Sequence, residues 1–276
     1  MPAELRAEVR AAAQVLADAG VPSPFHDAEE LAAHSLGVDR RDLWRQERVG
    51  SDFASYVRRR VAREPLQHIT GRAYFRHLTL AVGPGVFVPR PETEVVVEAA
   101  MAALAGVESP VVVDLGTGSG AIALAIAGEV PGARVHAVEA DPAAHAWAAR
   151  NAAGSGVDLR LGVMVDAFPD LDGSVDVVVS NPPYIPVGAV VRDPEVATHD
   201  PALALWSGED GLDAVRVVER VAARLLRAGG TVVVEHADLQ GESAPAVFTG
   251  AGWADVRDHP DLAGRDRYLT ARRAKG

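Results

Sequence analysis

Short runs of aliphatic residues alternate with stretches of helical periodicity between about residue 110 and residue 236. Each run is apolar enough to be a buried strand. The stretches between the runs are long enough to hold crossover helices, which favours parallel neighbours over hairpins. The pattern therefore predicts an α/β fold with a doubly wound, mostly parallel sheet. The runs are PVVVDLG (110–116), ARVHAVEAD (133–141), VDLRLGVMVD (157–166), SVDVVVSNP (174–182) and GGTVVVEHA (229–237).

The first 63 residues follow a helical period instead. Ser23 followed by Pro24 is typical of a helix start, and Ser51 can cap a third helix that Pro65 ends. A bundle of this size buries little apolar surface alone, so we expect it to pack on the rest or to act as a docking module. The apolar stripe of the first predicted helix consists of Leu5, Val9, Val15 and Leu16.

Residues 64–90 have a different character, because glycine and proline interrupt short β-type runs. This composition predicts a β-hairpin linker. A helix is expected to begin near Pro91, where Glu92 and Glu94 would complement the positive end of the helix dipole. The predicted organisation is a helical domain over residues 1–63, a hairpin linker over 64–90 and the sheet domain over 91–276.

Composition and charge narrow the functional classes. The 276 residues carry a formal net charge of −11, which argues against a duplex-binding surface. The arginines of YVRRRVARE (56–64) are interpreted as a solvated helix face. There is no cysteine, so disulfides and thiolate metal sites are excluded. The N-terminus has charges throughout and no apolar signal region, and we expect a cytoplasmic protein with no membrane contact.

A glycine-rich turn follows the first apolar run and precedes a helical stretch. Its glycines allow a tight turn and close approach of a ligand, and the helix amides after it would face that ligand. With Ala121 it also satisfies the permissive G-x-G-x-x-A dinucleotide fingerprint, and a plain glycine turn is the alternative. The turn consists of Gly116, Thr117, Gly118, Ser119 and Gly120.

Acidic residues end the next two runs. Glu139 can accept hydrogen bonds from both hydroxyls of a ribose, although it could also be an exposed glutamate at a helix start. Asp166 could accept from an adenine amino group, or it could be a turn-forming aspartate. If the turn binds a ligand, with or without the role of a dinucleotide fingerprint, the acid at the next strand tip predicts a ligand of the adenosine type.

The fourth run ends in SNPPYIP (180–186), where two prolines form a stiff corner. The side-chain oxygen of Asn181 and the carbonyl of Pro182 can both accept hydrogen bonds from one planar NH₂ group. Tyr184 can stack on the planar system that carries this group. A rigid turn through Pro182 and Pro183 is the alternative, but it does not account for Asn181 and Tyr184 together.

This combination resembles the amino methyltransferases that use S-adenosylmethionine and carry an N/D-P-P-Y motif. In these enzymes a planar nitrogen attacks the methyl group of a sulfonium, and no metal is needed. The nine histidines show no His-x-x-x-His pairing, and we expect no metal site. A nucleic-acid amine and a glutamine side-chain amide are the two substrate classes that fit.

Longer blocks resemble the peptide chain release factor glutamine methyltransferases, or HemK-like family, over about residues 5–272. The resemblance implies three parts in chain order: a helical substrate-recognition domain, a β-hairpin linker and a Rossmann-like catalytic domain. It also implies methylation of N5 of the glutamine in the Gly-Gly-Gln motif of class I release factors, with S-adenosylhomocysteine as product. The blocks are EPLQHITG (64–71), GVFVPRPETE (85–94), DLGTGSGAIALA (114–125), VVSNPPYIP (178–186), GGTVVVEHADLQGE (229–242) and DLAGRDR (261–267).

The resemblance also assigns site residues. Asn181, Pro182, Pro183 and Tyr184 would hold the glutamine amide, and the turn 116–120 with Glu139 would hold the cofactor. A further set would line the cofactor and substrate pocket: Phe87, Pro89, Arg90, Glu92, Asp166, Ala167 and Phe168.

The chain departs from the family pattern at two positions. Ala167 stands where some members have an aromatic residue, so Phe168 would have to supply the wall against adenine. Asp200 stands where glutamate is frequent before proline, which leaves the role of its loop open.

Three other functions compete with this interpretation. A nucleic-acid adenine-N6 methyltransferase shares the NPPY motif, but it would usually bring a basic surface or a target-reading domain. A nicotinamide dehydrogenase would explain only the glycine turn, and a non-catalytic binding module would not need Asn181 and Glu139. We expect a monomer that binds no nucleic acid directly.

Overall fold

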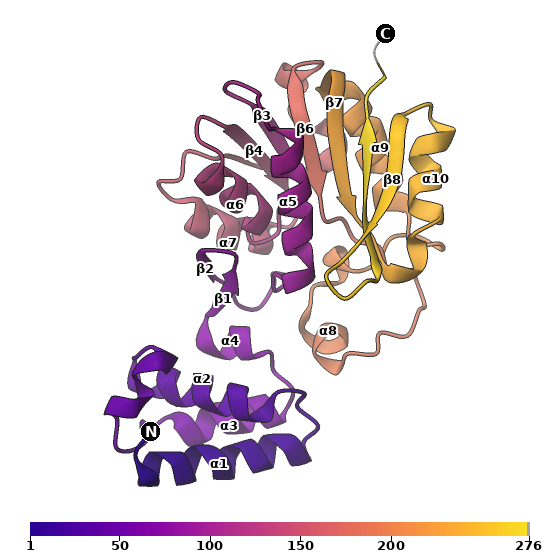
Figure 1. The fold of residues 1–276 in the computed structure, drawn as a ribbon. Coiled ribbons are helices and arrows are strands. Elements are labelled where there is room, and N and C mark those ends of the chain that lie inside the picture. The colour runs from indigo at the N-terminus through magenta and orange to yellow at the C-terminus, as the bar shows by residue number, and fades with distance from the viewer. Residues whose placement is uncertain (275–276) are drawn as a thin grey trace. The chain divides into compact units, whose positions relative to one another are not determined.

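The computed structural model describes residues 1–274. Within them a large sheet has the strand order β5-β4-β3-β6-β7-β9-β8, and a separate two-stranded sheet pairs β1 with β2 (Figure 1). The strands are β1 (Arg72–Phe75), β2 (Leu78–Ala81), β3 (Val111–Leu115), β4 (Arg134–Glu139), β5 (Asp158–Leu161), β6 (Val175–Ser180), β7 (Leu226–Glu235), β8 (Ala254–Pro260) and β9 (Asp266–Arg272).

Strands β3 to β6 lie within the first four predicted runs, β7 begins before the fifth run at Leu226, and the five strands pair in parallel. The predicted doubly wound fold is therefore confirmed. Every residue of β3 is buried, as expected for a strand covered on both faces. Helices α5, α6 and α7 form one layer over the sheet, and α9 and α10 form the other (Figure 1). These helices are α5 (Glu94–Ala103), α6 (Ala121–Glu129), α7 (Pro142–Ala152), α9 (Asp213–Leu225) and α10 (Ser243–Gly250).

Strands β8 and β9 were not predicted, and they extend the sheet in the antiparallel direction. Strand β8 is the edge and no residue of it is buried. Because β9 runs antiparallel to both β7 and β8, the β8–β9 turn lies at the same sheet edge as the end of β7. The segment DLAGRDR (261–267) forms this turn and the start of β9, where the Asp261 carboxylate accepts from the amides of Ala263 and Arg265.

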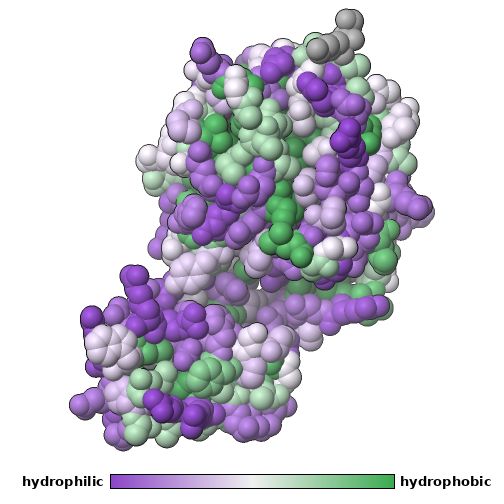
Figure 2. All heavy atoms as spheres, viewed as in Figure 1, coloured by the Kyte–Doolittle hydropathy of each residue, from purple (hydrophilic) through white to green (hydrophobic). Residues whose placement is uncertain are grey.

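The chain divides into two compact units, each described here by itself. The helical unit comprises residues 1–72, 82–84 and 191–199, and the sheet unit contains 73–81, 85–190 and the chain from Asp200 onward. Each unit has its own apolar core. Hydrophobic side chains reach the face drawn in Figure 2 in small groups between polar ones. The helices of the first unit are α1 (Ala3–Asp18), α2 (Pro24–Leu36), α3 (Phe53–Val61), α4 (Leu66–Thr70) and α8 (Pro194–His199).

Two details of the helical unit correct the sequence-based expectation. Val15 is 49% exposed and does not belong to the buried stripe of α1, which instead uses Ala12 and Ala13 beside the larger residues. Asp52, and not Ser51, is the residue that precedes α3, and its side chain makes no cap hydrogen bond.

The arginines of residues 56–64 do not form a uniformly solvated face, so that interpretation was wrong. Arg60 is only 4% exposed, and its guanidinium lies 2.7 Å from Asp27 of α2 and 2.8 Å from Glu195 of α8. Arg63 also reaches Glu195, at 2.9 Å. A buried cation thus joins three helices of this unit, including one that follows the NPPY motif in sequence.

The predicted hairpin is present as β1 and β2. Arg76 stands between the two strands and ties the hairpin to α5 and α6. Its guanidinium lies 2.6 Å from Glu129 and 2.7 Å from Glu98, and its backbone N–H donates to Glu94 at 2.9 Å. Hydrogen bonding from Arg76 lowers the pKa of the Glu129 carboxyl. Glu94 therefore anchors the hairpin through a backbone amide.

Candidate active site

Four neighbouring strands, β4, β3, β6 and β7, bring their carboxyl ends to one edge of the sheet. The strand order reverses between β3 and β6, which is where ligands bind in open α/β sheets. Glu139 ends β4 and the turn 116–120 follows β3. Asn181 follows β6 and Glu235 ends β7. The fold therefore places the predicted cofactor and substrate motifs side by side.

The glycine turn has a backbone that other residues rarely adopt. Gly116, Gly118 and Gly120 have φ values of +74°, +57° and +87°. The amides of Gly116 and Thr117 both donate to the carbonyl of Val138, at 3.0 Å. A Cβ atom added to Gly118 would meet no heavy atom within 4 Å. The turn thus leaves open space beside its backbone, as a cradle for a ligand requires.

The polar side chains of the turn face the protein interior. The Thr117 hydroxyl donates to Asp114 at 2.6 Å, and Thr117 and Ser119 are both buried. Burial raises the pKa of the Asp114 carboxyl to about 7, although hydrogen bonds from Thr117 and Ala123 oppose this shift. The turn consequently offers its backbone to a ligand, while the buried Thr117 hydroxyl holds the turn to Asp114.

Glu139 holds the glycine turn as well as the tip of β4. One carboxylate oxygen accepts from the Gly118 amide at 2.8 Å and the other accepts from the Asp141 amide at 2.9 Å. Each oxygen has two acceptor positions, so both retain one for the hydroxyls of a ribose. The buried acid at this tip and the open space beside Gly118 fit an adenosine-type cofactor.

The segment after β5 departs from the expected arrangement. Asp166 is exposed, as a cofactor contact at the rim would be, whereas Ala167 and Phe168 are buried. The Phe168 ring is 1% exposed, with the Arg160 guanidinium 4.4 Å above it and the His136 ring at 5.4 Å. Phe168 is therefore a packing residue, and the expectation that it forms the adenine wall needs correction.

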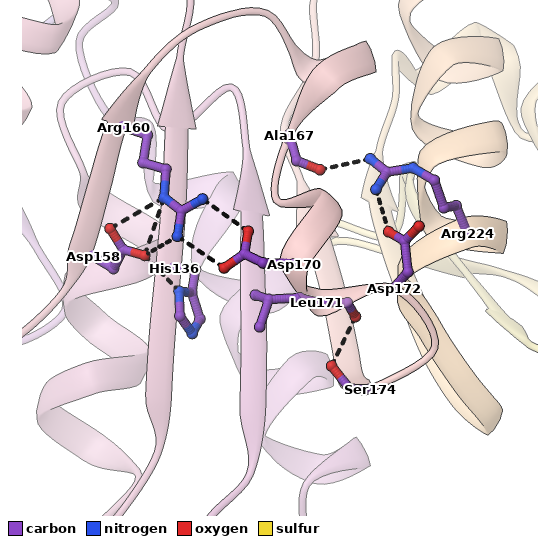
Figure 3. Close-up of polar contacts among 9 residues, drawn as sticks. All are labelled: His136, Asp158, Arg160, Ala167, Asp170, Leu171, Asp172, Ser174 and Arg224. Atoms are coloured by element: carbon purple, nitrogen blue, oxygen red, sulfur yellow. Dashed lines mark hydrogen bonds and ion pairs between the residues drawn. The ribbon is translucent and has the colours of Figure 1, made fainter.

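Two arginines hold this segment in place (Figure 3). Arg160 lies 2.8 Å from Asp158 and 3.0 Å from Asp170, and these contacts lower the pKa of both carboxyls. Arg224 donates to the carbonyl of Ala167 at 2.5 Å and also pairs with Asp172. The backbone around Asp166 is thereby fixed at the sheet edge without a ligand.

The NPPY corner is fixed by contacts to three other segments. The Asn181 side-chain NH₂ donates to the Thr93 hydroxyl at 3.2 Å, and Pro182 is buried. The carbonyl of Tyr184 accepts from Gln240 at 3.1 Å. Burial raises the pKa of the Tyr184 phenol, which therefore stays neutral. The amide of Ile185 donates to Leu205 at 2.8 Å and closes the loop that follows.

Two residues of the segment FVPRPE (87–92) form ion pairs with segments distant in sequence: Arg90 with Asp200, and Glu92 with Arg265. The Arg90 guanidinium lies 5.0 Å from the centre of the Phe87 ring and 2.9 Å from the carboxylate of Asp200. Glu92 pairs with Arg265 of the β8–β9 turn at 3.6 Å. Asp200 thus fixes Arg90 across 110 positions of the sequence. Phe87, Pro89, Arg90 and Glu92 are all partly exposed.

Sequence analysis missed Thr93, Glu235 and the pairing of Asp200. Glu235 could have been found, because it ends the apolar run TVVVE as Glu139 ends the run HAVE. Thr93 carried no comparable signal. Among residues 1–274 no cluster of three or more His, Asp or Glu side chains could hold a metal ion. No described helix combines the length and apolarity needed to cross a membrane.

Two family models match this chain. The PrmC N-terminal domain matches residues 9–71, and the methyltransferase small domain matches residues 78–194. A solved methyltransferase from Pyrococcus furiosus has the same fold, with a TM-score of 0.50 and 19% identity, over 72% of this chain and 90% of that one.

Curated relatives match nearly the whole chain. The release factor glutamine methyltransferase of Streptomyces coelicolor is 61% identical, and that of Mycolicibacterium smegmatis is 50% identical, each over 98% of both chains. A 4-amino-L-phenylalanine/4-methylamino-L-phenylalanine methyltransferase of Streptomyces pristinaespiralis is 46% identical over 89% of this chain and 86% of its own. The chain belongs to the release factor glutamine methyltransferase family.

Proposed function

We propose that this enzyme transfers a methyl group from S-adenosylmethionine to N5 of the glutamine in the Gly-Gly-Gln motif of class I release factors, in support of translation termination. The observation that carries the proposal is the NPPY corner beside the glycine turn, in a chain 61% identical end to end to a release factor glutamine methyltransferase. An amide nitrogen is a poor nucleophile, so the site must orient it.

The cofactor would lie on the glycine turn, with its ribose at Glu139 and its adenine near Asp166. When bound, S-adenosylmethionine supplies a methyl carbon that is electrophilic because it is attached to a sulfonium. Asn181 Oδ1 and the carbonyl of Pro182 accept the two hydrogens of the substrate amide. These acceptors raise the electron density on nitrogen and point its lone pair toward the methyl carbon. Methyl transfer would break the bond between sulfur and the methyl carbon, so that S-adenosylhomocysteine leaves as a neutral thioether, and the methylated nitrogen would release one proton to solvent.

The domain roles are part of the same proposal. Residues 1–63 recognise the release factor, 64–90 form the linker and 91–276 carry out the transfer. We place the enzyme in the cytoplasm, where release factors act, as a monomer that does not bind nucleic acid directly.

The relative that methylates an aromatic amine makes a second acceptor class worth testing. An arylamine nitrogen is also planar and conjugated, so the same two acceptors could hold it. The decisive experiment measures transfer of labelled methyl from S-adenosylmethionine to four acceptors under one set of conditions. These are a purified class I release factor, the same factor with its motif glutamine changed to alanine, 4-amino-L-phenylalanine and duplex DNA.

Label on the wild-type factor alone supports the proposed function. Label on 4-amino-L-phenylalanine alone would replace the acceptor, and label on DNA would move the chain to the adenine-N6 class. Asn181→Ala should abolish transfer while cofactor binding persists, and normal turnover by a folded variant would contradict the role given to Asn181.

A further inference from the structure

A buried acid lies beside the NPPY corner, and neither the site residues assigned from the sequence nor the proposed mechanism includes it. Strands β6 and β7 pair with Ser180 opposite Val234, so the next residues in register are Asn181 and Glu235. Glu235 is 2% exposed. One of its carboxylate oxygens is buried with no hydrogen-bond partner among the described residues. A charged group without a structural salt bridge is costly at such a position.

The hydroxyl of Thr93 connects this acid to the corner. Thr93 lies in the turn Pro91–Thr93 before α5 and is 4% exposed. It accepts a hydrogen bond from the Asn181 NH₂ group at 3.2 Å. Burial raises the pKa of the Glu235 carboxyl, and hydrogen bonds from the Thr93 and Tyr184 hydroxyls to this carboxyl oppose the shift. Two hydroxyls therefore converge on one carboxylate.

The single proton of Thr93 decides how the Asn181 amide is oriented. If the hydroxyl donates to Glu235, only its lone pairs remain for Asn181. Asn181 must then turn its NH₂ group toward Thr93, which turns Oδ1 away from Thr93 and leaves it free as an acceptor. If the hydroxyl donated to Asn181 instead, Oδ1 would be occupied and the NH₂ group would face the substrate.

We propose that Glu235 is a positioning residue that, through Thr93, fixes the Asn181 amide with its oxygen toward the substrate nitrogen. The proposal rests on the proposed function, because it assumes that Asn181 Oδ1 is the acceptor for that nitrogen. The same carboxylate holds the Tyr184 hydroxyl, so one buried charge orients both side chains of the corner. An amide with its NH₂ group toward the substrate would present a donor to a group that is itself a donor.

The protonation state of Glu235 should appear in the pH dependence. Burial raises the pKa of this carboxyl to about 7. The neighbouring charges act in opposite directions, since Arg267 of β9 lowers the pKa and Glu92 raises it. The ionised carboxylate can only accept hydrogen bonds, so both hydroxyls must donate to it, whereas the protonated carboxyl carries a proton that it can itself donate to Thr93. The turnover number should therefore rise with pH through about 7.

The test compares wild type with Glu235→Gln, Thr93→Val and Thr93→Ser. Glu235→Gln keeps the size of the side chain but cannot ionise. We expect its turnover number to fall between about tenfold and a hundredfold, with an unchanged dissociation constant for S-adenosylmethionine. The rise through pH 7 should disappear. Thr93→Val should behave alike, whereas Thr93→Ser retains the hydroxyl and should remain within about threefold of wild type.

Two controls separate positioning from folding. Glu242→Gln removes an exposed carboxylate seven residues along the chain and should leave turnover and its pH profile unchanged. The double variant Glu235→Gln with Thr93→Val should lose no more than either single variant, because both act through one hydrogen-bonded chain. Equal turnover and an equal pH profile in Glu235→Gln and wild type would overturn the proposal.

A second readout does not depend on the acceptor. The side-chain NH₂ signals of Asn181 are followed by ¹⁵N NMR and assigned by their loss in Asn181→Asp. They should shift with pH near 7 in wild type and should not shift in Glu235→Gln. If the release factor is methylated but the chemical shifts of these signals do not change with pH, the positioning role of Glu235 fails and the proposed function stands. If the signals titrate but no release factor is methylated, the proposed function fails and the positioning role stands.

Discussion

The buried cation Arg60 provides a sharp test of the energetics of the helical unit. Its guanidinium contacts Asp27 and Glu195, and all three side chains are at most 14% exposed. Replacing Arg60 by Met removes the charge and keeps much of the volume. Breaking a buried ion pair by removing one partner typically costs about 3–5 kcal/mol, because the other charge stays buried. Since Glu195 keeps Arg63 at 2.9 Å, we expect the lower end of this range.

A loss of about 3 kcal/mol should increase the open population of this unit by about a hundredfold. Native-state hydrogen exchange of the full-length protein measures this change directly. The amides of α1, α2 and α3 should lose protection, and those of β3 and β6 serve as the internal reference. Arg59→Met is the matched control. Its partner Glu64 is partly exposed and Arg59 itself is 40% exposed, so its loss should cost less than about 1 kcal/mol.

The double variant Arg60→Met with Asp27→Leu distinguishes a stranded charge from lost packing. If the stranded Asp27 carboxylate causes most of the loss, removing it should restore most of the protection. Equal losses in Arg60→Met and Arg59→Met would refute the reasoning, and so would a double variant less stable than Arg60→Met alone.

Three further outcomes follow from the sheet unit. Gly118→Ala should weaken S-adenosylmethionine binding, measured by calorimetry, because the new methyl group enters the open space beside the turn, and it should also lower the melting temperature, because the φ of +57° strains a residue that carries a Cβ atom. Asp200→Ala should release Arg90 and lower turnover with little change in cofactor affinity, whereas Asp200→Glu should retain part of it. Asp114 has a pKa raised from 3.8 to about 7, so its contribution to stability is complete below about pH 4 and is lost as pH rises through 7. Asp114→Asn should remove this decline, as measured by urea unfolding at pH 5 and pH 8, and an identical decline in the variant would contradict the assignment.

The parallel strands could be predicted because a strand that is buried on both faces requires a nearly continuous run of apolar residues. VVVDL and VDVVVS are such runs, and the glycine turn and the NPPY corner follow them directly. The edge strand β8 gave no such signal, since its exposed residues ADVRDHP alternate in no clear way. An edge strand with many charged residues is also a common protection against unwanted pairing.

The contacts that tune the site could not be predicted, because they depend on how distant segments come together. Asn181 and Thr93 are 88 positions apart, and Arg90 and Asp200 are 110 apart. Phe168 shows the opposite failure. In the sequence, an aromatic residue just after a strand is a reasonable candidate for a side chain that packs against adenine. In the structure, Phe168 has a left-handed backbone, with φ of +48°, and its ring packs against Arg160 and His136 instead.

Two acids at strand ends, Glu139 and Glu235, lie beside the glycine turn and the NPPY corner. Each accepts hydrogen bonds from donors of the protein itself. Glu139 accepts from the amide of Gly118, and Glu235 accepts from the hydroxyls of Thr93 and Tyr184. The first contact fixes the glycine turn proposed to hold the cofactor, and the second fixes the NPPY corner proposed to hold the substrate nitrogen. Glu139 ends β4 and Glu235 ends β7 of one sheet, with β3 and β6 between them, so the strand register sets the distance between the two acids. Orientation of a weak nucleophile gives the largest rate gain when the groups that bind it are already held in place, and the contacts of Glu139 and Asn181 hold such groups within the protein.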